Sequence, residues 1–244
     1  MNFYIIHLER DKKREANVSK ISALLPGKVH IIDAVDGQDL KEDQLNQFVA
    51  KKNLFPPYPF NLRKTEVACF LSHRKAWEEV IKSEEIGAFI LEDDVEIDEN
   101  FFRNSLEIIE RHASEFDFIR LPYKNREKPK KIHIHHNEAT LFSPKVIGLG
   151  MQCQYVGLDA AKKLLINTSS FDRPIDTTIQ MFWITKVRPK VILPSGVREI
   201  SKQVGGTSIH SYEKFYRKVF REVARPLYRL AFYIINTYKS YLRS

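Results

Sequence analysis

Residues 87–94 read Gly87-Ala-Phe-Ile-Leu-Glu-Asp-Asp94, a short apolar run that ends in three consecutive carboxylates. Such a run, bounded by polar residues, predicts a buried β-strand over 87–91. Three adjacent acids repel one another when buried, so they are best tolerated where water or a cation compensates their charge. In open α/β sheets, ligands bind beyond the carboxyl ends of the strands. The segment therefore predicts an acidic ligand site at the end of a strand.

The three acids also have a plainer interpretation, as a solvated turn in front of a helix. Asp98 is placed to cap a helix that runs to about His112, and acidic side chains are favourable near a helix N-terminus. Val95 and Ile97, however, put apolar side chains next to the acids. Their presence favours a partly enclosed site over an exposed turn.

The flanking segments alternate between strand and helix patterns. An apolar run over 3–8, helical spacing of apolar residues over 18–25 and a second strand over 29–33 predict a βαβ unit with parallel strands. A short helix and a Pro-rich loop follow within 38–65, and Thr65 is a plausible N-cap for a helix over about 66–83. Later elements are expected as a strand over 116–121, a basic loop over 124–131, a hairpin around 136–138, a strand within 148–156, a helix capped by Asp159, a helical stretch from 174 to about 185 and a strand over 187–193. The pattern predicts an α/β fold with a central, mostly parallel sheet.

Composition limits the class of protein. The chain has 244 residues, 43% of them hydrophobic and 29% charged, which suits a globular domain with an appendage. No apolar run approaches the roughly 18 residues that span a bilayer, and the apolar stretch in the first ten residues is too short for a signal peptide. We therefore expect a cytoplasmic protein.

Cys69 and Cys153 lack metal-ligand spacing and are expected to be buried free thiols.

The C-terminal segment, residues 211–244, carries most of the positive charge. It has eight Lys or Arg against two Glu, a net +6 out of +8 for the whole chain. Apolar residues recur at helical spacing on both sides of Pro226, which predicts a basic amphipathic helix. Such a helix suits an anionic membrane surface, and packing on the main domain or on a second subunit is the alternative. No recognition motif points to nucleic acid.

Several separated segments, in order, resemble glycosyltransferase family 25. Tyr4-Ile-Ile-His-Leu-Glu-Arg10 with Arg14 is similar to the family's first strand and the turn after it, and Ala34-Val-Asp-Gly37 resembles its next turn. The helix that carries Glu66-Val-Ala-Cys69, Leu71-Ser-His73 and Trp77 looks like the family's most distinctive helix, and Leu91-Glu-Asp-Asp94 matches its acidic segment. Tyr155, Ala160 and Pro174-Ile-Asp176 resemble later elements, and His7 departs from the family's usual Asn or Ser.

The resemblance implies a GT-A-type nucleotide-sugar transferase domain over residues 1–210, followed by the tail over 211–244. Members move galactose or glucose from a UDP-sugar with inversion, so UDP-galactose or UDP-glucose is the expected donor and Mn²⁺ or Mg²⁺ the expected cofactor. Asp94, with Asp93 or Glu92, would hold the metal. Asp176 is the candidate general base, because an inverting transfer needs a group that accepts the acceptor's proton, and a favourable charge at a helix N-terminus is the alternative.

Four further residues are candidates for donor binding. Arg10 and Arg14 offer planar, bidentate donors for a diphosphate or a ribose, or are surface helix charges. Ser72 and His73 lie in the matching helix and either approach the donor or only cap and pack.

A lipid-linked lipooligosaccharide or lipopolysaccharide is the expected acceptor, with the enzyme peripheral on the inner face of the cytoplasmic membrane. Two alternatives stay open: a nucleotidyltransferase with a similar metal site, and a non-catalytic membrane adaptor. The transferred sugar, the linkage and the oligomeric state are not encoded in a readable pattern.

Overall fold

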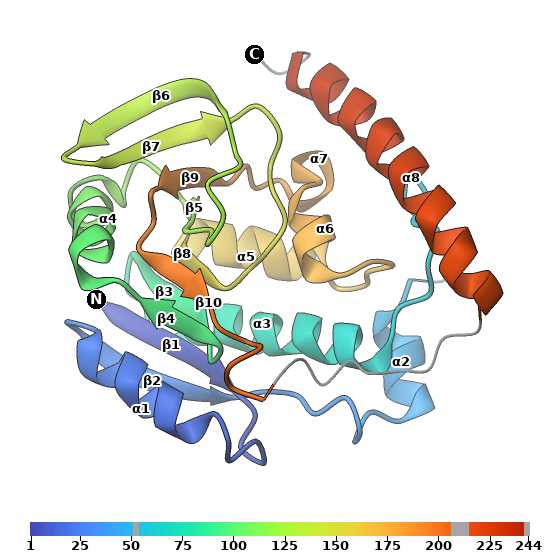
Figure 1. Ribbon diagram of the computed structural model, residues 1–244, viewed down its shortest axis with the longest axis horizontal. Coiled ribbons are helices and arrows are strands. Elements are labelled where there is room, and N and C mark those ends of the chain that lie inside the picture. The colour runs from blue at the N-terminus through green and yellow to red at the C-terminus, as the bar shows by residue number, and fades with distance from the viewer. Residues whose placement is uncertain (51–53, 206–214, 242–244) are drawn as a thin grey trace.

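An eight-stranded sheet forms the centre of the computed structural model, which describes residues 1–50, 54–205 and 215–241 and, in the last range, the side chains of 222–239 (Figure 1). The strand order is β2-β1-β3-β8-β5-β9-β7-β6. The strands are β1 Asn2–His7, β2 Lys28–Asp33, β3 Gly87–Glu92, β5 Phe118–Arg120, β6 Pro129–His136, β7 Ala139–Pro144, β8 Cys153–Gly157 and β9 Lys190–Leu193. A separate two-stranded ribbon pairs β4 (Val95–Ile97) with β10 (Val197–Glu199).

The predicted βαβ unit is confirmed and fixes where the acidic segment lies. β1 pairs in parallel with β2 on one side and β3 on the other, with His7 opposite Asp33 and Ile6 opposite Glu92. The connection between β1 and β2 is α1 (Glu15–Leu24). Because parallel strands end at the same edge of a sheet, the turns after β1, β2 and β3 meet there.

The other half of the sheet mixes directions. β8 is antiparallel to both β3 and β5, β9 is parallel to β5, and β7 and β6 form an antiparallel hairpin next to β9. These pairings make β2, β1, β3, β5, β9 and β6 run one way and only β8 and β7 the other. The sheet is thus mostly parallel in direction, and the hairpin expected around 136–138 is present.

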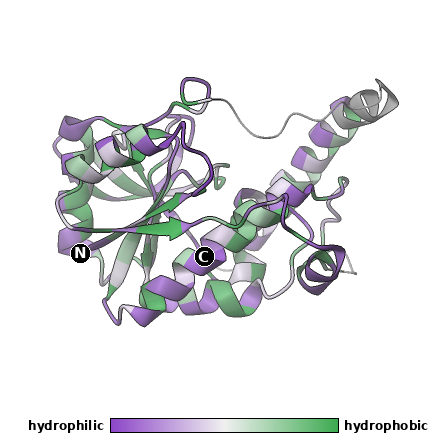
Figure 2. Ribbon diagram, turned by 90° about the horizontal axis from the view of Figure 1, so that it is seen from below, coloured by the Kyte–Doolittle hydropathy of each residue, from purple (hydrophilic) through white to green (hydrophobic). Residues whose placement is uncertain are grey.

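Helices cover both faces of the sheet and bury two apolar cores. One core lies under α3 (Lys64–Lys82) and α5 (Leu158–Asn167), where Phe70 stacks on Phe171 with ring centroids 3.7 Å apart. The other lies under α1 and α4 (Glu99–His112) and includes the buried Ile21 and Ile109. Phe70 is fully buried. Hydrophobic residues gather in the strands and on the inner helix faces (Figure 2).

Several expected boundaries are wrong, for local reasons. α3 begins at Lys64 rather than after Thr65, because Glu66 Oε2 accepts the backbone N–H of Arg63 (2.8 Å) and stabilises an earlier start. The N-cap of α5 is Gly157, so Asp159 lies in the first turn. The basic loop is shorter than expected, because β6 begins at Pro129 and pairs with β7.

Short elements account for the remaining differences. The helical stretch from 174 is two short helices, α6 (Ile175–Ile179) and α7 (Phe182–Thr185), and α2 (Glu42–Phe48) is the short helix expected within 38–65. β4 and β10 were not expected, since three-residue strands leave little periodicity to detect.

The C-terminal helix α8 (Phe215–Tyr241) continues through Pro226 and crosses one side of the molecule (Figure 1). Its inner face packs on the main domain: Arg173 donates to the Tyr228 hydroxyl (2.8 Å), and the buried Phe232 lies 5.6 Å from Trp183 between ring centroids. Its outer face exposes apolar side chains, namely Val223, Leu227, Leu230, Ile234 and Tyr238. The domain boundary near 210 and residues 211–214 lie outside the described residues. Among the helices that are described, none combines the length and hydropathy of a membrane span.

We expect the core between α3 and α5 to carry much of the stability. Leu164→Ala removes a fully buried side chain of α5 and should lower the free energy of unfolding by about 2–5 kcal/mol. Ile166→Ala, on the exposed face of the same helix, should lower it by less than about 1 kcal/mol. Urea denaturation of both variants measures the difference, and equal losses would contradict this assignment of the core.

Candidate active site

Turns from three parallel strands and one face of α3 enclose a cavity of about 300 Å³, here called the acidic cleft. Its walls include all but one of the residues singled out from the sequence: Arg10, Arg14, Ser72, His73, Glu92, Asp93 and Asp94. The turn over 34–38 after β2 completes the lining. The remaining candidate, Asp176, lines a neighbouring cavity of about 880 Å³.

Asp93 is held by two side chains from the first strand and its turn. One carboxylate oxygen lies 2.7 Å from His7 Nδ1, and the other accepts a hydrogen bond of 2.5 Å from Arg14. The amide of Asn17 also donates to the backbone oxygens of Asp93 (2.8 Å) and Val95 (2.9 Å). Both oxygens of Asp93 are thus engaged, and the turn after β3 is fixed on α1.

Asp94 differs, because part of its carboxylate has no protein partner. Burial, with the negative charge of Glu92 as the next cause, raises the pKa of Asp94 to about 7, while the nearby Arg14 opposes this shift. Oδ2 lies 3.5 Å from Arg14, whereas Oδ1 is buried and receives no hydrogen bond from the described part of the chain. A cation would compensate both the charge and the missing contact, so the residues present fit a divalent metal.

Glu92 lies at the opposite end of the acidic segment, next to α3. Gln154 donates to His73 Nδ1 (3.1 Å), which leaves His73 Nε2–H to donate to Glu92 (3.2 Å). Gln154 comes from β8, so this chain of contacts links three elements. His73 therefore orients the Glu92 carboxylate at the cleft.

Cys69 was expected to be buried, but it is exposed at the wall of the acidic cleft. Its sulfur, a His73 ring nitrogen and a Glu92 oxygen lie within 4.8 Å of one another. Desolvation raises the pKa of the Cys69 thiol well above its usual range, and the charges of Glu92, Asp176 and Asp94 add to this. Mg²⁺ and Mn²⁺ prefer oxygen ligands to sulfur, so Asp94 and Glu92 are the better pair. Cys153 is buried and free, as expected.

Two of the candidates hold the cleft together instead of facing an open space. Arg10 forms a bidentate ion pair with Asp36 and also contacts Gln38, both in the turn after β2. Ser72 donates to the Ala68 carbonyl and accepts from the Val35 N–H, each at 2.8 Å. These contacts tie the turn after β2 to the turn after β1 and to α3.

Asp176 begins α6 and lines the larger cavity, here called the basic cavity because five Lys or Arg side chains line it. Burial raises the pKa of Asp176, although hydrogen bonds from Thr177 and the Gly150 backbone oppose the shift. The negative charge of Asp176 helps to raise the pKa of Cys69 in the acidic cleft. Glu66, which precedes Cys69 by three residues on α3, lines the basic cavity. The two cavities therefore adjoin at the N-terminal half of α3.

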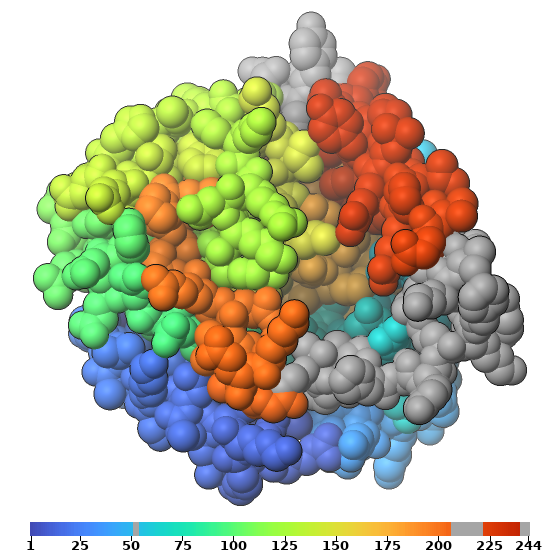
Figure 3. Space-filling model, viewed as in Figure 1, coloured from blue at the N-terminus to red at the C-terminus, as the bar shows by residue number. Residues whose placement is uncertain are grey.

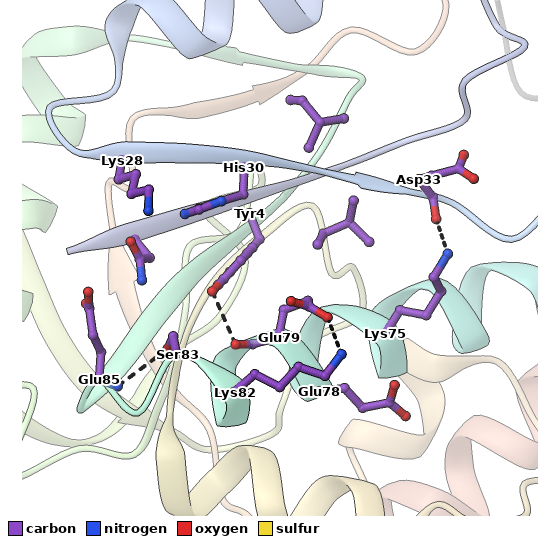
Figure 4. Close-up of a pocket in the computed structure, with 13 residues that line it drawn as sticks. Tyr4, Lys28, His30, Asp33, Lys75, Glu78, Glu79, Lys82, Ser83 and Glu85 are labelled. Carbon is purple, nitrogen blue, oxygen red and sulfur yellow. Dashed lines mark hydrogen bonds and ion pairs between the residues drawn. The ribbon is translucent and has the colours of Figure 1, made fainter.

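The hollow beside β2, at the other side of the molecule, lacks these features (Figure 4). It measures about 660 Å³ and contains none of the residues predicted from the sequence. Its charged groups contact one another: Lys82 pairs with Glu79 (2.6 Å), and Lys75 donates to the Asp33 carbonyl (2.5 Å). We assign it no role.

Some contributors to the acidic cleft were missed from the sequence. Cys69 lies four residues before the candidate His73 on one helix, a spacing that places both on the same face and could have been recognised. Asn17 and Gln154 act through side-chain hydrogen bonds across the fold, for which a single sequence has no local signal.

In α/β proteins, ligands bind at the carboxyl ends of the parallel strands. The acidic cleft and its two arginines lie at this place in the fold. The sequence model described as "Glycosyltransferase family 25 (LPS biosynthesis protein)" matches residues 1–179, which include every candidate site residue. The chain belongs to glycosyltransferase family 25.

Relatives with curated names agree with this membership. The chain is 32% identical over 112 residues to procollagen galactosyltransferase 2 of Mus musculus, which covers 44% of this chain and 18% of the relative. It is 27% identical over 174 residues to a glycosyltransferase 25 family member of Aedes aegypti, covering 67% and 28% of the two chains. A Rattus norvegicus relative, 34% identical over 103 residues (40% and 18%), is named probable inactive glycosyltransferase 25 family member 3. The chain thus spans less than a third of the length of these relatives.

The raised pKa of Asp94 predicts a specific pH dependence of stability without metal. This group favours folding at low pH, and the advantage is lost as pH rises from its usual value of 3.8 to about 7. Asp94→Asn removes the charge, so in EDTA it should match the wild type near pH 4 and exceed it at pH 8 by on the order of 2 kcal/mol. Chemical denaturation across pH measures this, and a variant that is less stable at pH 8 would contradict it.

Proposed function

We propose that this protein is a metal-dependent, inverting glycosyltransferase of the GT-A type that transfers galactose from UDP-galactose to a sugar hydroxyl. The observation that carries the proposal is the buried oxygen of Asp94 beside Glu92, which accepts no hydrogen bond from the described residues, in a cleft formed by family 25 motifs. The name of the mouse relative supports galactose over glucose.

Asp94 and Glu92 are the proposed ligands of Mn²⁺ or Mg²⁺. Asp93 was an equal candidate, but Arg14 and His7 already occupy both of its oxygens. We therefore give Asp93 a positioning role, in which it holds the turn that presents Asp94. When bound, the metal neutralises the diphosphate of the departing UDP.

The other polar residues position the donor and its surroundings. Arg14 lies between Asp93 and Asp94 and can reach a phosphate oxygen once a metal shares the charge of Asp94. Arg10 and Ser72 keep the turn after β2 at the rim of the cleft, and His73 keeps Glu92 in place.

Asp176 is the proposed general base. Inversion requires the acceptor hydroxyl to lose its proton on the face of the sugar opposite the leaving group. Asp176 lines the basic cavity next to the acidic cleft. Its pKa is raised toward neutral pH, which makes it a stronger base than an exposed carboxylate. The acceptor would then occupy the basic cavity and the donor the acidic cleft.

We propose a lipid-linked lipooligosaccharide or lipopolysaccharide as the acceptor, at the inner face of the cytoplasmic membrane. The family description supports the acceptor class. The exposed apolar side chains on the outer face of α8, together with the basic charge of the segment, support contact with an anionic membrane.

Donor turnover tests the metal site. With Mn²⁺ and UDP-galactose, the wild type should release UDP, and Asp94→Asn should reduce the rate at least about a hundredfold. Asp117→Asn is the matched control, because this carboxylate is half-exposed and lies outside both cavities, and it should keep full activity.

Three outcomes would count against the proposal. Undiminished UDP release by Asp94→Asn would refute the metal assignment, and release of pyrophosphate would indicate a nucleotidyltransferase. A failure of UDP plus Mn²⁺ to raise the unfolding temperature would favour a non-catalytic adaptor.

Vesicle flotation tests the membrane contact. The protein should float with vesicles that contain anionic lipid, and Leu227→Glu/Leu230→Glu should reduce bound protein at least about tenfold, since it places charge on the exposed apolar face of α8. Ile86→Glu/Ile166→Glu changes two equally exposed residues elsewhere and should float like the wild type. Equal flotation of the two variants would refute the role of α8.

A further inference from the structure

The basic cavity has a composition that the transfer of a neutral sugar does not require. Its volume of about 880 Å³ suits a saccharide of a few rings. Five cationic side chains line it: Arg126, Lys128, Lys145, Arg225 and Arg229. Figure 3 shows the hollow between α8 and the segment before β6, so α8 completes one of its walls.

The cations come from two opposite walls. Arg126 and Lys128 precede β6 and Lys145 follows β7, whereas Arg225 and Arg229 lie one turn apart on α8. An anion between the walls would interact with both groups at once. Guanidinium groups in particular bind phosphate and carboxylate oxygens in a bidentate geometry.

The acids in the cavity do not cancel this charge. The charge of Glu127 is compensated by the protein itself, because its carboxylate accepts hydrogen bonds from the buried Arg120 (2.8 Å) and from the Gly148 N–H (2.9 Å). Glu66 is engaged by the Arg63 N–H at the start of α3. Asp176 is the remaining acid, a single carboxylate among five cationic side chains.

Aromatic side chains supply the apolar part of the lining, namely Tyr58, Phe60, Tyr228, Phe232 and Tyr233. Flat rings offer stacking surfaces for the C–H faces of a sugar. Arg173 holds the Tyr228 hydroxyl (2.8 Å), and Tyr58 packs edge-on against Tyr228 with centroids 5.4 Å apart. The ring positions are therefore fixed by packing on the main domain.

We propose that the basic cavity selects an acceptor saccharide that carries an anionic group, a phosphate or a carboxylate, close to the hydroxyl that is galactosylated. The aromatic residues bind the sugar ring, and the two cationic walls bind the anion. This inference rests on the proposed function for the role of the cavity as the acceptor site. Recognition of an anionic sugar by these residues is a separate property and can be measured without turnover.

Binding of simple sugars tests the proposal on the full chain. We expect glucose 6-phosphate or glucuronate to bind at least about tenfold more tightly than methyl glucoside in NMR titrations at low salt. Comparison of the two acids tells whether phosphate or carboxylate is preferred. Arg225→Gln/Arg229→Gln should remove the advantage and leave the affinity for methyl glucoside unchanged.

Two further variants make the result decisive. Arg126→Gln/Lys128→Gln changes the opposite wall, outside α8, and should also remove the advantage. Arg111→Gln/Arg198→Gln removes the same charge far from the cavity and should retain it. Equal affinity for charged and neutral sugars in the wild type, or an advantage that survives in both wall variants, would overturn the proposal.

A different measurement tests the proposed function. UDP release from UDP-galactose without acceptor reports on the acidic cleft alone, and it is measured on the wild type. Loss of UDP release in the wild type would refute the transferase activity, whereas loss of anion preference would refute only the acceptor class.

Discussion

The engagement of Asp93 by Arg14 and His7 is the interaction on which the site depends. It joins the end of β1 and the following turn to the turn after β3, inside the protein. Three adjacent carboxylates would otherwise repel one another in a poorly solvated place. Because one acid is neutralised by Arg14 and another is oriented by His73, the third can remain buried with one oxygen that accepts no hydrogen bond from the described residues. Within this cluster of like charges, Asp93 thus has a structural role and Asp94 is the reactive carboxylate.

Much of the fold could be predicted because it depends on local patterns. The apolar runs of β1, β2 and β3 and the helical spacing in α1 and α3 are visible in the sequence, and parallel pairing follows from a βαβ unit. The antiparallel insertion of β8 between β3 and β5 could not be foreseen, since it depends on which distant strand fills a gap in the sheet. The start of α3 was misplaced because the Glu66 side chain, rather than Thr65, satisfies the first backbone donors.

The candidate site, like the fold, could be predicted only in part. Motif order was sufficient to name residues that the structure brings into one cleft, because most of them follow strands that end at the same edge and Ser72 and His73 lie on the helix beside it. It could not distinguish Asp93 from Asp94, since their difference lies in partners supplied by α1 and the turn after β1. The relatives of this chain include one named a galactosyltransferase and one named probable inactive. Assignment of an activity within this family therefore depends on individual side chains and not on the fold.

The position of α8 has a thermodynamic consequence. One face of the helix lines the basic cavity and is fastened to Arg173, and the other presents apolar side chains outward. A surface that binds the outer face and a ligand that fills the cavity therefore act on the same rigid element. If occupancy of the outer face changes the affinity of the cavity for its ligand, occupancy of the cavity must change the affinity of the outer face by the same free energy, because linkage is reciprocal. A single helix would thereby couple the two binding events.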